Sequence, residues 1–264
     1  MFHTIKQGTL EYLTTDSLSD SVHCFSTRFG GVSEGYLASL NLGTHRGDAP
    51  ENVRENYRIL GAAVGFAPEQ TVFTKQEHTD IIRRVGRDDC GTGLFREQTT
   101  VCDGLITDEP GVALCCFGAD CTTILLSDPV TGALGAVHSG WRGTAMGIVS
   151  RAVEAMGREF GSRPADIRAA IGPCIGPCCF EVGPEVPEAM RNALGADAEA
   201  CIAPRGEKFY VDLKGLNCLW LERAGLSGID ICPDCTKCQS SRFWSHRAAG
   251  NARGSQAAII MRKE

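Results

Sequence analysis

The sequence predicts an α/β or α+β fold in which mixed β-sheets and helices form a single compact domain across residues 1–264. Short apolar runs of strand length alternate with segments whose apolar residues recur at helical spacing. Glycine and proline punctuate these segments throughout the chain. The chain is long enough to bury one large core, and no tandem repeat or low-complexity linker divides it.

The first half of the chain is predicted to contain one helix and several short strands. The helix spans residues 50–64, because Val53, Tyr57 and Leu60 follow helical spacing and Gly65 provides a stop signal. Strands are predicted at 22–27, 71–76 and 80–85. Residues 87–100 are polar and contain glycine, which predicts a mobile loop.

The second half begins with four apolar runs that are predicted as strands, at 102–107, 112–117, 122–126 and 133–137. The strongest helix follows at 143–160, with Ile148, Ala152 and Phe160 on one face. The remaining predictions are strands at 167–171, 209–211, 229–231 and 257–261, and helices at 181–194 and 213–224.

Composition and charge exclude several functional classes. The net charge of -6 and the absence of long like-charged runs argue against nucleic acid as the main partner. No stretch of about eighteen apolar residues is present, so no membrane span is expected. The opening residues lack the features of a secretory signal, so we expect a cytoplasmic protein. Most of the 14 cysteines are then expected to be reduced and buried.

Three residues stand out as a candidate metal site. His78 and His138 are two of only six histidines, and each lies in a polar motif beside a strand-like run. Cys121 lies at the junction of two apolar runs. Strand ends that are distant in sequence can converge, and two imidazoles with one thiolate give zinc three ligands and an open position. Asp120 or Glu77 is expected to orient a ligand imidazole. The alternative is two structural histidines and a buried cysteine.

Two further segments have either a functional or a structural interpretation. Residues 138–144 lead into the strongest helix with small residues and Arg142, which suits an anion site or a glycine-shaped turn. Residues 171–183 are rich in glycine and proline, so they form an ordered loop that either shapes a pocket or is a rigid turn. The sequence does not assign a role to Cys178 and Cys179 in this loop.

Cys232, Cys235 and Cys238 form a C-x2-C-x2-C triplet, and Cys218 lies upstream as a possible fourth ligand. Such spacing occurs in structural zinc and iron–sulfur sites, although the closely placed fourth cysteine of a ferredoxin run is missing. Reduced, partly buried cysteines are the preferred interpretation.

Nine segments between about residue 22 and the C-terminus form a recognisable series: FSTRFGGVSEG, SLNLGTHRGD, KQEHTD, CDGLITDEPGVAL, ADCTTILLSDP, HSGWRGT, IGPCIGPCCFEVG, FYVDLKGLN and CTKCQSSRFWSHR. Together, and in this order, they resemble one known family, which has been called polyphenol-oxidase laccase-like protein, peptidoglycan-editing factor and zinc-dependent purine nucleoside phosphorylase. The resemblance departs from the family pattern at Thr79 and Thr123 and near the C-terminus, at 246–249 and 253–255.

The resemblance implies a layered α/β/β/α arrangement and one Zn2+ per chain, bound by His78, Cys121 and His138. It also implies phosphorolysis of adenosine, inosine and methylthioadenosine, with deamination of adenosine as a side activity. Purine nucleosides and phosphate are then the expected small-molecule partners. Candidate substrate contacts are Asn41, His45, Arg58 and Arg142.

Three alternatives are kept. Cys121 as nucleophile and His138 as base would suit amide hydrolysis in a peptidoglycan precursor. Copper-dependent phenol oxidation is not expected, since a multicopper enzyme needs more histidines than six. A binding protein with structural zinc would need a fourth protein ligand such as Cys116 or Cys179. The oligomeric state is not predicted.

Overall fold

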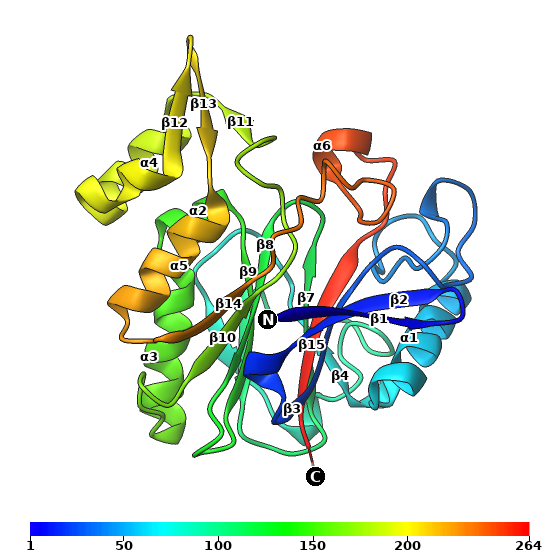
Figure 1. The fold of residues 1–264 in the computed structure, drawn as a ribbon. Coiled ribbons are helices and arrows are strands. Elements are labelled where there is room, and N and C mark those ends of the chain that lie inside the picture. Colours follow the sequence, from blue (N-terminus) through cyan, green and yellow to red (C-terminus); the bar gives the residue numbers. More distant parts are fainter. Residues whose placement is uncertain (264) are drawn as a thin grey trace.

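Two six-stranded mixed sheets pack face to face in the computed structural model, which describes residues 1–263 (Figure 1). The first sheet has the order β1 (Phe2–Gln7), β2 (Leu10–Thr15), β3 (Ser21–Ser26), β15 (Gln256–Arg262), β7 (Ala113–Gly118) and β4 (Thr71–Phe73). The second has the order β14 (Gly228–Ile231), β10 (Arg168–Ile171), β8 (Thr122–Ser127), β9 (Leu134–Ser139), β6 (Gly104–Thr107) and β5 (Ile82–Arg84). Neighbouring strands are antiparallel except for the pairs β4/β7, β10/β14 and β5/β6.

Helices cover the outer faces of both sheets. The helices are α1 (Pro50–Val64), α2 (Trp141–Ala145), α3 (Ile148–Phe160), α4 (Glu185–Leu194), α5 (Leu213–Arg223) and α6 (His246–Ala249). α1 packs on the first sheet, and α3 and α5 pack on the second. The predicted layered α/β/β/α fold with mixed sheets is therefore confirmed.

A smaller three-stranded sheet, in the order β11 (Glu181–Val182), β13 (Lys208–Val211) and β12 (Ile202–Arg205), lies beside α4 (Figure 1). Short 3-10 segments are also present: η1 (Asp16–Leu18), η2 (Gly35–Leu37), η3 (Pro68–Gln70), η4 (Arg87–Asp89) and η5 (Gly195–Cys201). No helix of the described part of the chain is long and apolar enough to cross a membrane.

The central strands are buried on both faces, which explains their nearly continuous apolar sequences. Leu114 of β7 and Leu125 of β8 point into the layer between the sheets. Their neighbours point outward, Cys115 toward α1 and Ile124 toward α3. The period-2 alternation of strand side chains thus supplies three adjacent cores from the same strands.

The predicted helix at 50–64 is confirmed, with Pro50 as its first residue and Gly65 left-handed directly after it, at φ 106°. The single helix predicted at 143–160 is wrong, because the structure breaks it into α2 and α3. The break is at Gly147, whose φ of 69° lies in the left-handed region that glycine adopts without a steric penalty.

Several other predictions need correction at their ends. The strand predicted at 71–76 stops at Phe73, and the one at 80–85 covers only Ile82–Arg84. Polar residues between them form the loop that carries His78. The helix predicted at 181–194 begins at Glu185, after the two-residue strand β11. Strands β1, β2 and β12 were not predicted.

Candidate metal centre

The three predicted ligands come together at one end of the two-sheet core. His78 lies in the loop between β4 and β5, Cys121 in the turn between β7 and β8, and His138 near the end of β9. Their ligand atoms all lie within 4.8 Å of one another. The Sγ of Cys121 is 3.8 Å from Nε2 of His78, and the two imidazole rings meet edge to face. Strand ends that are distant in the sequence thus form a common site.

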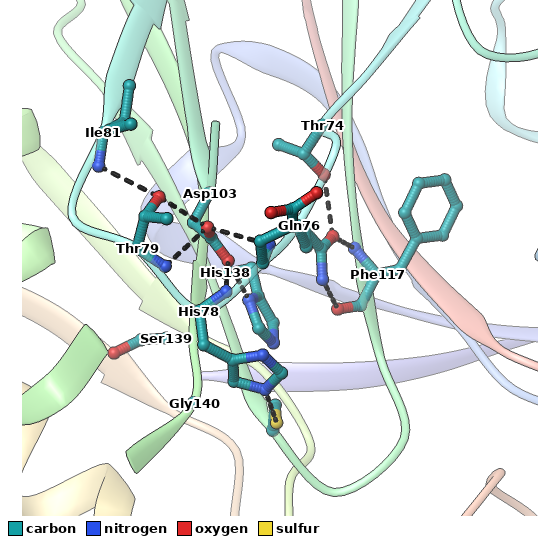
Figure 2. A network of polar contacts seen from close by, with 12 residues as sticks. Thr74, Gln76, His78, Thr79, Ile81, Asp103, Phe117, His138, Ser139 and Gly140 are labelled. Atoms are coloured by element: carbon teal, nitrogen blue, oxygen red, sulfur yellow. Dashed lines mark hydrogen bonds and ion pairs between the residues drawn. The ribbon is translucent and has the colours of Figure 1, made fainter. Parts of the chain in front are cut away.

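Asp103 organises this site through hydrogen bonds to both histidine segments (Figure 2). This fully buried carboxylate accepts a hydrogen bond from Nδ1 of His138 at 2.8 Å and from the backbone N–H of His78 at 3.0 Å. It also accepts from both the N–H and the hydroxyl of Thr79. Burial alone would raise the pKa of Asp103, but the bonds from His138 and Thr79 lower it to about 2. The charged carboxylate fixes the Nδ1–H tautomer of His138, so that Nε2 is free for a metal.

This arrangement corrects the prediction that Asp120 or Glu77 orients an imidazole. Asp120 accepts hydrogen bonds from the Thr236 hydroxyl and the Arg247 N–H, both at 2.6 Å. Glu77 contributes only its backbone N–H to Asp103. The sequence did not single out Asp103, although it belongs to the CDGLITDEPGVAL segment, because nothing in that segment shows which distant imidazole its carboxylate reaches.

The loop that carries His78 is held on its other side by Gln76. The Gln76 side chain donates to the carbonyl of Phe117 at 2.9 Å and accepts from the Phe117 N–H at 2.7 Å (Figure 2). The side-chain amide thus pairs with Phe117 in the way that a backbone amide of a neighbouring strand would. His78 itself has φ 60°, a left-handed conformation that is uncommon for residues other than glycine. Hydrogen bonds from both sides therefore hold a conformation that the free chain disfavours.

Gly140 leaves room for the two ligands that it contacts. A Cβ at this position would lie 2.6 Å from Cδ2 of His78 and 3.2 Å from Sγ of Cys121. The backbone of Gly140, at φ -69°, is accessible to any residue. The absence of a side chain is therefore required for space and not for backbone conformation.

The thiol and the buried imidazole polarise each other. Burial alone would raise the pKa of Cys121, but the neighbouring His138 and His78 lower it to about 6. Burial would likewise lower the pKa of His138, but the Cys121 thiolate and the Asp103 carboxylate raise it to about 9. Cys121 is thus present largely as the thiolate, which is the form that binds metals.

The donor set fits a single thiophilic ion. Tetrahedral zinc places an imidazole nitrogen and a thiolate sulfur about 3.6 Å apart, close to the separation of Cys121 and His78. In the described residues 1–263, no fourth His, Cys, Asp or Glu joins this group. Cys116 is buried among apolar residues between the sheets, and Cys179 belongs to a different cluster. All three side chains lie on the wall of a cavity, so an ion held by them would be accessible to a reactant.

That cavity has a volume of about 990 Å³ and contains all three ligands on its wall. Four stretches of chain supply most of the remaining wall: residues 43–46, 73–77, 93–98 and 117–120. Residues 93–98 belong to the predicted loop at 87–100, which is tied down by a hydrogen bond from the Gln98 side chain to the Phe73 carbonyl at 2.6 Å. The loop is therefore part of the site.

Two half-buried arginines give the cavity a cationic wall. Arg46 donates to the Ser255 hydroxyl, and Arg253 donates to the Gly254 carbonyl. Neither forms an ion pair with a carboxylate in the part of the chain that the structure describes. Burial lowers the pKa of Arg253 to about 10, and repulsion from Arg46 adds to this effect. The Asp120 carboxylate and the Cys121 thiolate attract Arg253 only from beyond ion-pair distance, so the two adjacent guanidinium groups suit an anion.

The structure places only one of the four predicted substrate contacts on this cavity. His45 lines it. Asn41 is buried and bonds Gly43, Asp48 and the Ser255 N–H. Arg58 is 65% exposed on α1 and pairs with Glu55. Arg142 is exposed and stacks on Trp141.

The sequence missed the wall residues that follow β14 and precede β15. His246, Arg247 and Arg253 all line the cavity, in a segment where the chain departs from the family pattern. Arg46 was also missed, although it lies beside His45. The concentration of basic residues in this segment was an available clue, but only the fold brings these residues close to the candidate metal ligands.

Comparison with known proteins gives consistent matches along the chain. The profile of the family described as multi-copper polyphenol oxidoreductase laccase matches residues 22–263. A protein named purine nucleoside phosphorylase YlmD, from Geobacillus stearothermophilus, is 38% identical over 90% of this chain and 89% of its own length. A purine nucleoside phosphorylase from Bacteroides thetaiotaomicron is 35% identical over 96% of this chain and 95% of its own. The crystal structure of YlmD from G. stearothermophilus superposes with a TM-score of 0.93, with 35% identity and 99% coverage of both chains.

Proposed function

We propose that this chain, which belongs to the family described as multi-copper polyphenol oxidoreductase laccase, is a zinc-dependent purine nucleoside phosphorylase. The observation that carries the proposal is the position of Arg46 and Arg253, which form no ion pair within residues 1–263, on the cavity wall that also holds His78, Cys121 and His138. An inorganic phosphate held by these guanidinium groups would face a metal-binding site across one cavity.

The cavity supports a nucleoside as the second reactant. Its volume lies at the upper end of the range of about 300–1,000 Å³ for small-molecule sites. Phe73, Phe95, Phe117 and Phe180 provide apolar wall against which a purine can pack. Arg247 and His246 add donors at the rim, where a sugar or a ring nitrogen would be recognised.

Different residues of the chain would have different roles in phosphorolysis. Arg46 and Arg253 bind and orient phosphate for attack at C1′ of the ribose, while the cavity keeps the reactants in register. Asp103 holds the His138 imidazole in one tautomer and position throughout. The metal supplies Lewis-acid stabilisation of negative charge when bound. Deamination of adenosine would use the same cavity as a side activity.

The donor set is better suited to zinc than to laccase-type copper. Two histidines and one cysteine partly imitate a blue-copper centre, but such a centre also uses a weak axial ligand, commonly methionine. No methionine lines the cavity among the described residues. Of the remaining histidines, His3 pairs with Asp16, and His23 is buried within β3. The other two, His45 and His246, line the cavity, and four histidines are too few for the additional copper cluster of a multicopper enzyme.

The test is to incubate purified, zinc-loaded protein with adenosine, with and without phosphate. We expect adenine and ribose-1-phosphate only when phosphate is present. Cys121→Ser should abolish the reaction together with metal binding, and Cys218→Ser, which changes a thiol on α5 outside the cavity, should not. Arg253→Gln should raise the KM for phosphate at least tenfold more than the exposed control Arg205→Gln. No adenine from zinc-loaded protein would rule the proposal out.

A second candidate function is amide hydrolysis in a peptidoglycan precursor by a metal-free enzyme. The observation that favours it is the chain of contacts from the Cys121 thiolate through His138 to Asp103, which is the arrangement of a cysteine nucleophile, its base and an orienting carboxylate. If metal-free protein is fully active and loses its activity when Cys121 is alkylated, the result supports this function. Activity that requires one zinc at Cys121 would exclude it.

A further inference from the structure

A second group of ligands lies outside the cavity and consists only of cysteines. Cys178 and Cys179 belong to the loop between β10 and β11, and Cys235 and Cys238 to the segment that follows β14. Their four Sγ atoms all lie within 4.8 Å of one another. The Sγ of Cys238 is 3.5 Å from that of Cys178 and 3.4 Å from that of Cys179. The triplet considered from the sequence is thus divided, because Cys232 and Cys218 do not belong to this group.

The backbone fixes the two segments against each other. A parallel bridge joins Cys174 to Cys235, and the Thr236 N–H donates to the Cys174 carbonyl at 3.0 Å. The Gly176 N–H donates to Sγ of Cys235 at 3.2 Å. An N–H directed at a sulfur stabilises the thiolate form, which is the form that binds a metal.

The spacing of the sulfurs selects among the possible uses of four cysteines. A tetrahedral ion with metal–sulfur bonds of about 2.3 Å places its four sulfurs about 3.8 Å apart, within the limit observed here. A four-iron cluster spreads its cysteine sulfurs farther than this, because the cluster lies between them. A disulfide would pair Cys238 with only one of its two neighbours and leave the other thiols unused.

We propose that Cys178, Cys179, Cys235 and Cys238 form a structural zinc site with four thiolate ligands, separate from the site in the cavity. Four protein ligands close the coordination sphere, so this ion has no position for a reactant. Binding releases the protons of those cysteines that are still thiols. The Arg247 guanidinium, which donates to the carbonyls of Cys179 and Glu181, offsets part of the negative charge.

The position of this site explains what the ion would do. Thr236, between Cys235 and Cys238, donates through its hydroxyl to the carboxylate of Asp120, the residue before Cys121. Ile175 donates its N–H to the Asp120 carbonyl at 3.0 Å. Phe180, the residue after Cys179, and Arg247, which donates to the Cys179 carbonyl, line the cavity. The ion would therefore join two segments that form one wall of the cavity and hold the turn that carries Cys121.

The first test measures metal content in a background that lacks the cavity site, His78→Ala/Cys121→Ser. We expect that this variant, purified under reducing conditions, retains one zinc per chain, with an X-ray absorption spectrum of four sulfurs at about 2.3 Å. Adding Cys178→Ser and Cys238→Ser should remove this zinc. The matched control, Cys201→Ser and Cys218→Ser in the same background, should retain it. A background variant without zinc, or zinc that survives the loss of Cys178 and Cys238, would overturn the proposal.

The second test uses the unmodified chain, so it does not depend on whether the variants fold. Cys178 and Cys238 are exposed and would react quickly with iodoacetamide if they were free. We expect mass spectrometry to show both protected in zinc-loaded protein and both alkylated once a chelator is added. Immediate alkylation of either thiol, a mass loss that indicates a disulfide, or the absorption of an iron–sulfur cluster would each contradict a zinc site.

Discussion

Asp103 is the residue on which the geometry of the candidate metal centre depends most. His138, His78 and Thr79 all direct N–H groups at the Asp103 carboxylate. An asparagine has the same shape, but its NH2 group would replace one accepting oxygen and face these donors. We expect Asp103→Asn to weaken zinc binding about 10–100-fold, measured by competition with a chromophoric chelator. Asp108→Asn, at a carboxylate in a half-exposed ion pair with Arg84, is the control. Equal zinc affinity in both variants would show that Asp103 does not orient the ligand.

Gly140 provides a second prediction at the level of single residues. In Gly140→Ala, the new methyl group would overlap His78 and crowd Cys121, whereas the backbone would need no change. We expect zinc binding and activity to fall at least tenfold. Gly228→Ala is the matched control, since its nearest neighbouring atom would be 3.5 Å away. Crystal or solution data that show His78 unmoved in Gly140→Ala would contradict the steric explanation.

Within the first sheet, strand β3 carries a buried histidine whose protonation opposes folding. Nε2 of His23 accepts the Thr15 N–H at 2.9 Å, so the folded chain requires the neutral ring, and burial lowers the pKa of His23. In the unfolded chain the pKa of the His23 imidazole is about 6.5. As the pH falls, the unfolded state therefore binds a proton at His23 before the folded state does. The contribution of the neutral His23 to the free energy of unfolding is complete above the unfolded-state pKa and is lost progressively below it.

We expect this loss to disappear in His23→Gln, which keeps an acceptor for Thr15 but does not titrate. The stability of the wild type relative to the variant should fall by up to about 1.4 kcal/mol per pH unit below pH 6.5. Urea unfolding of both proteins at pH 7.5, 6.5 and 5.5 measures this difference, and the protonation of other groups cancels in the comparison. Parallel pH profiles would show that His23 does not titrate with folding.

The elements that the sequence predicted are those whose pattern is strong locally. The buried strands β6 to β9 were found because both faces are apolar, and α1 because its spacing, its first proline and its final glycine agree. The break at Gly147 was missed, since glycine inside a helical pattern does not by itself reveal a positive φ. The hairpin of β1 and β2 was missed because β1 is largely exposed and lacks a clear alternation.

The same limit applies to the candidate site. His78, Cys121 and His138 were predicted because rare ligand types interrupt apolar runs near strand ends. Asp103 and Arg253 carry no such signal, and their roles depend on partners far away in the chain. Arg58 was selected from the sequence, but the helix places it on the exposed side of α1. Tertiary structure decides which charged residues reach a cavity.

For the molecule as a whole, we expect metal binding to raise stability. An ion that binds only the folded state stabilises it by about 2.7 kcal/mol when its free concentration is a hundred times its Kd. When protein from which a chelator has removed the metal is unfolded by heat, its Tm should therefore rise with added zinc. In Cys121→Ser the part of the rise that belongs to the cavity site should be missing. A Tm that does not respond to zinc in the unmodified protein would exclude a bound structural or catalytic ion.

The chain crosses from the first sheet to the second at two of the three ligand positions. His78 lies between β4 and β5 and Cys121 between β7 and β8, and each of these pairs has one strand in each sheet. The three donors can therefore meet only after both halves of the sandwich have formed and docked in their final alignment. A misassembled chain would have no affinity at this position, so uptake of the ion would distinguish correctly assembled molecules from trapped ones during biogenesis.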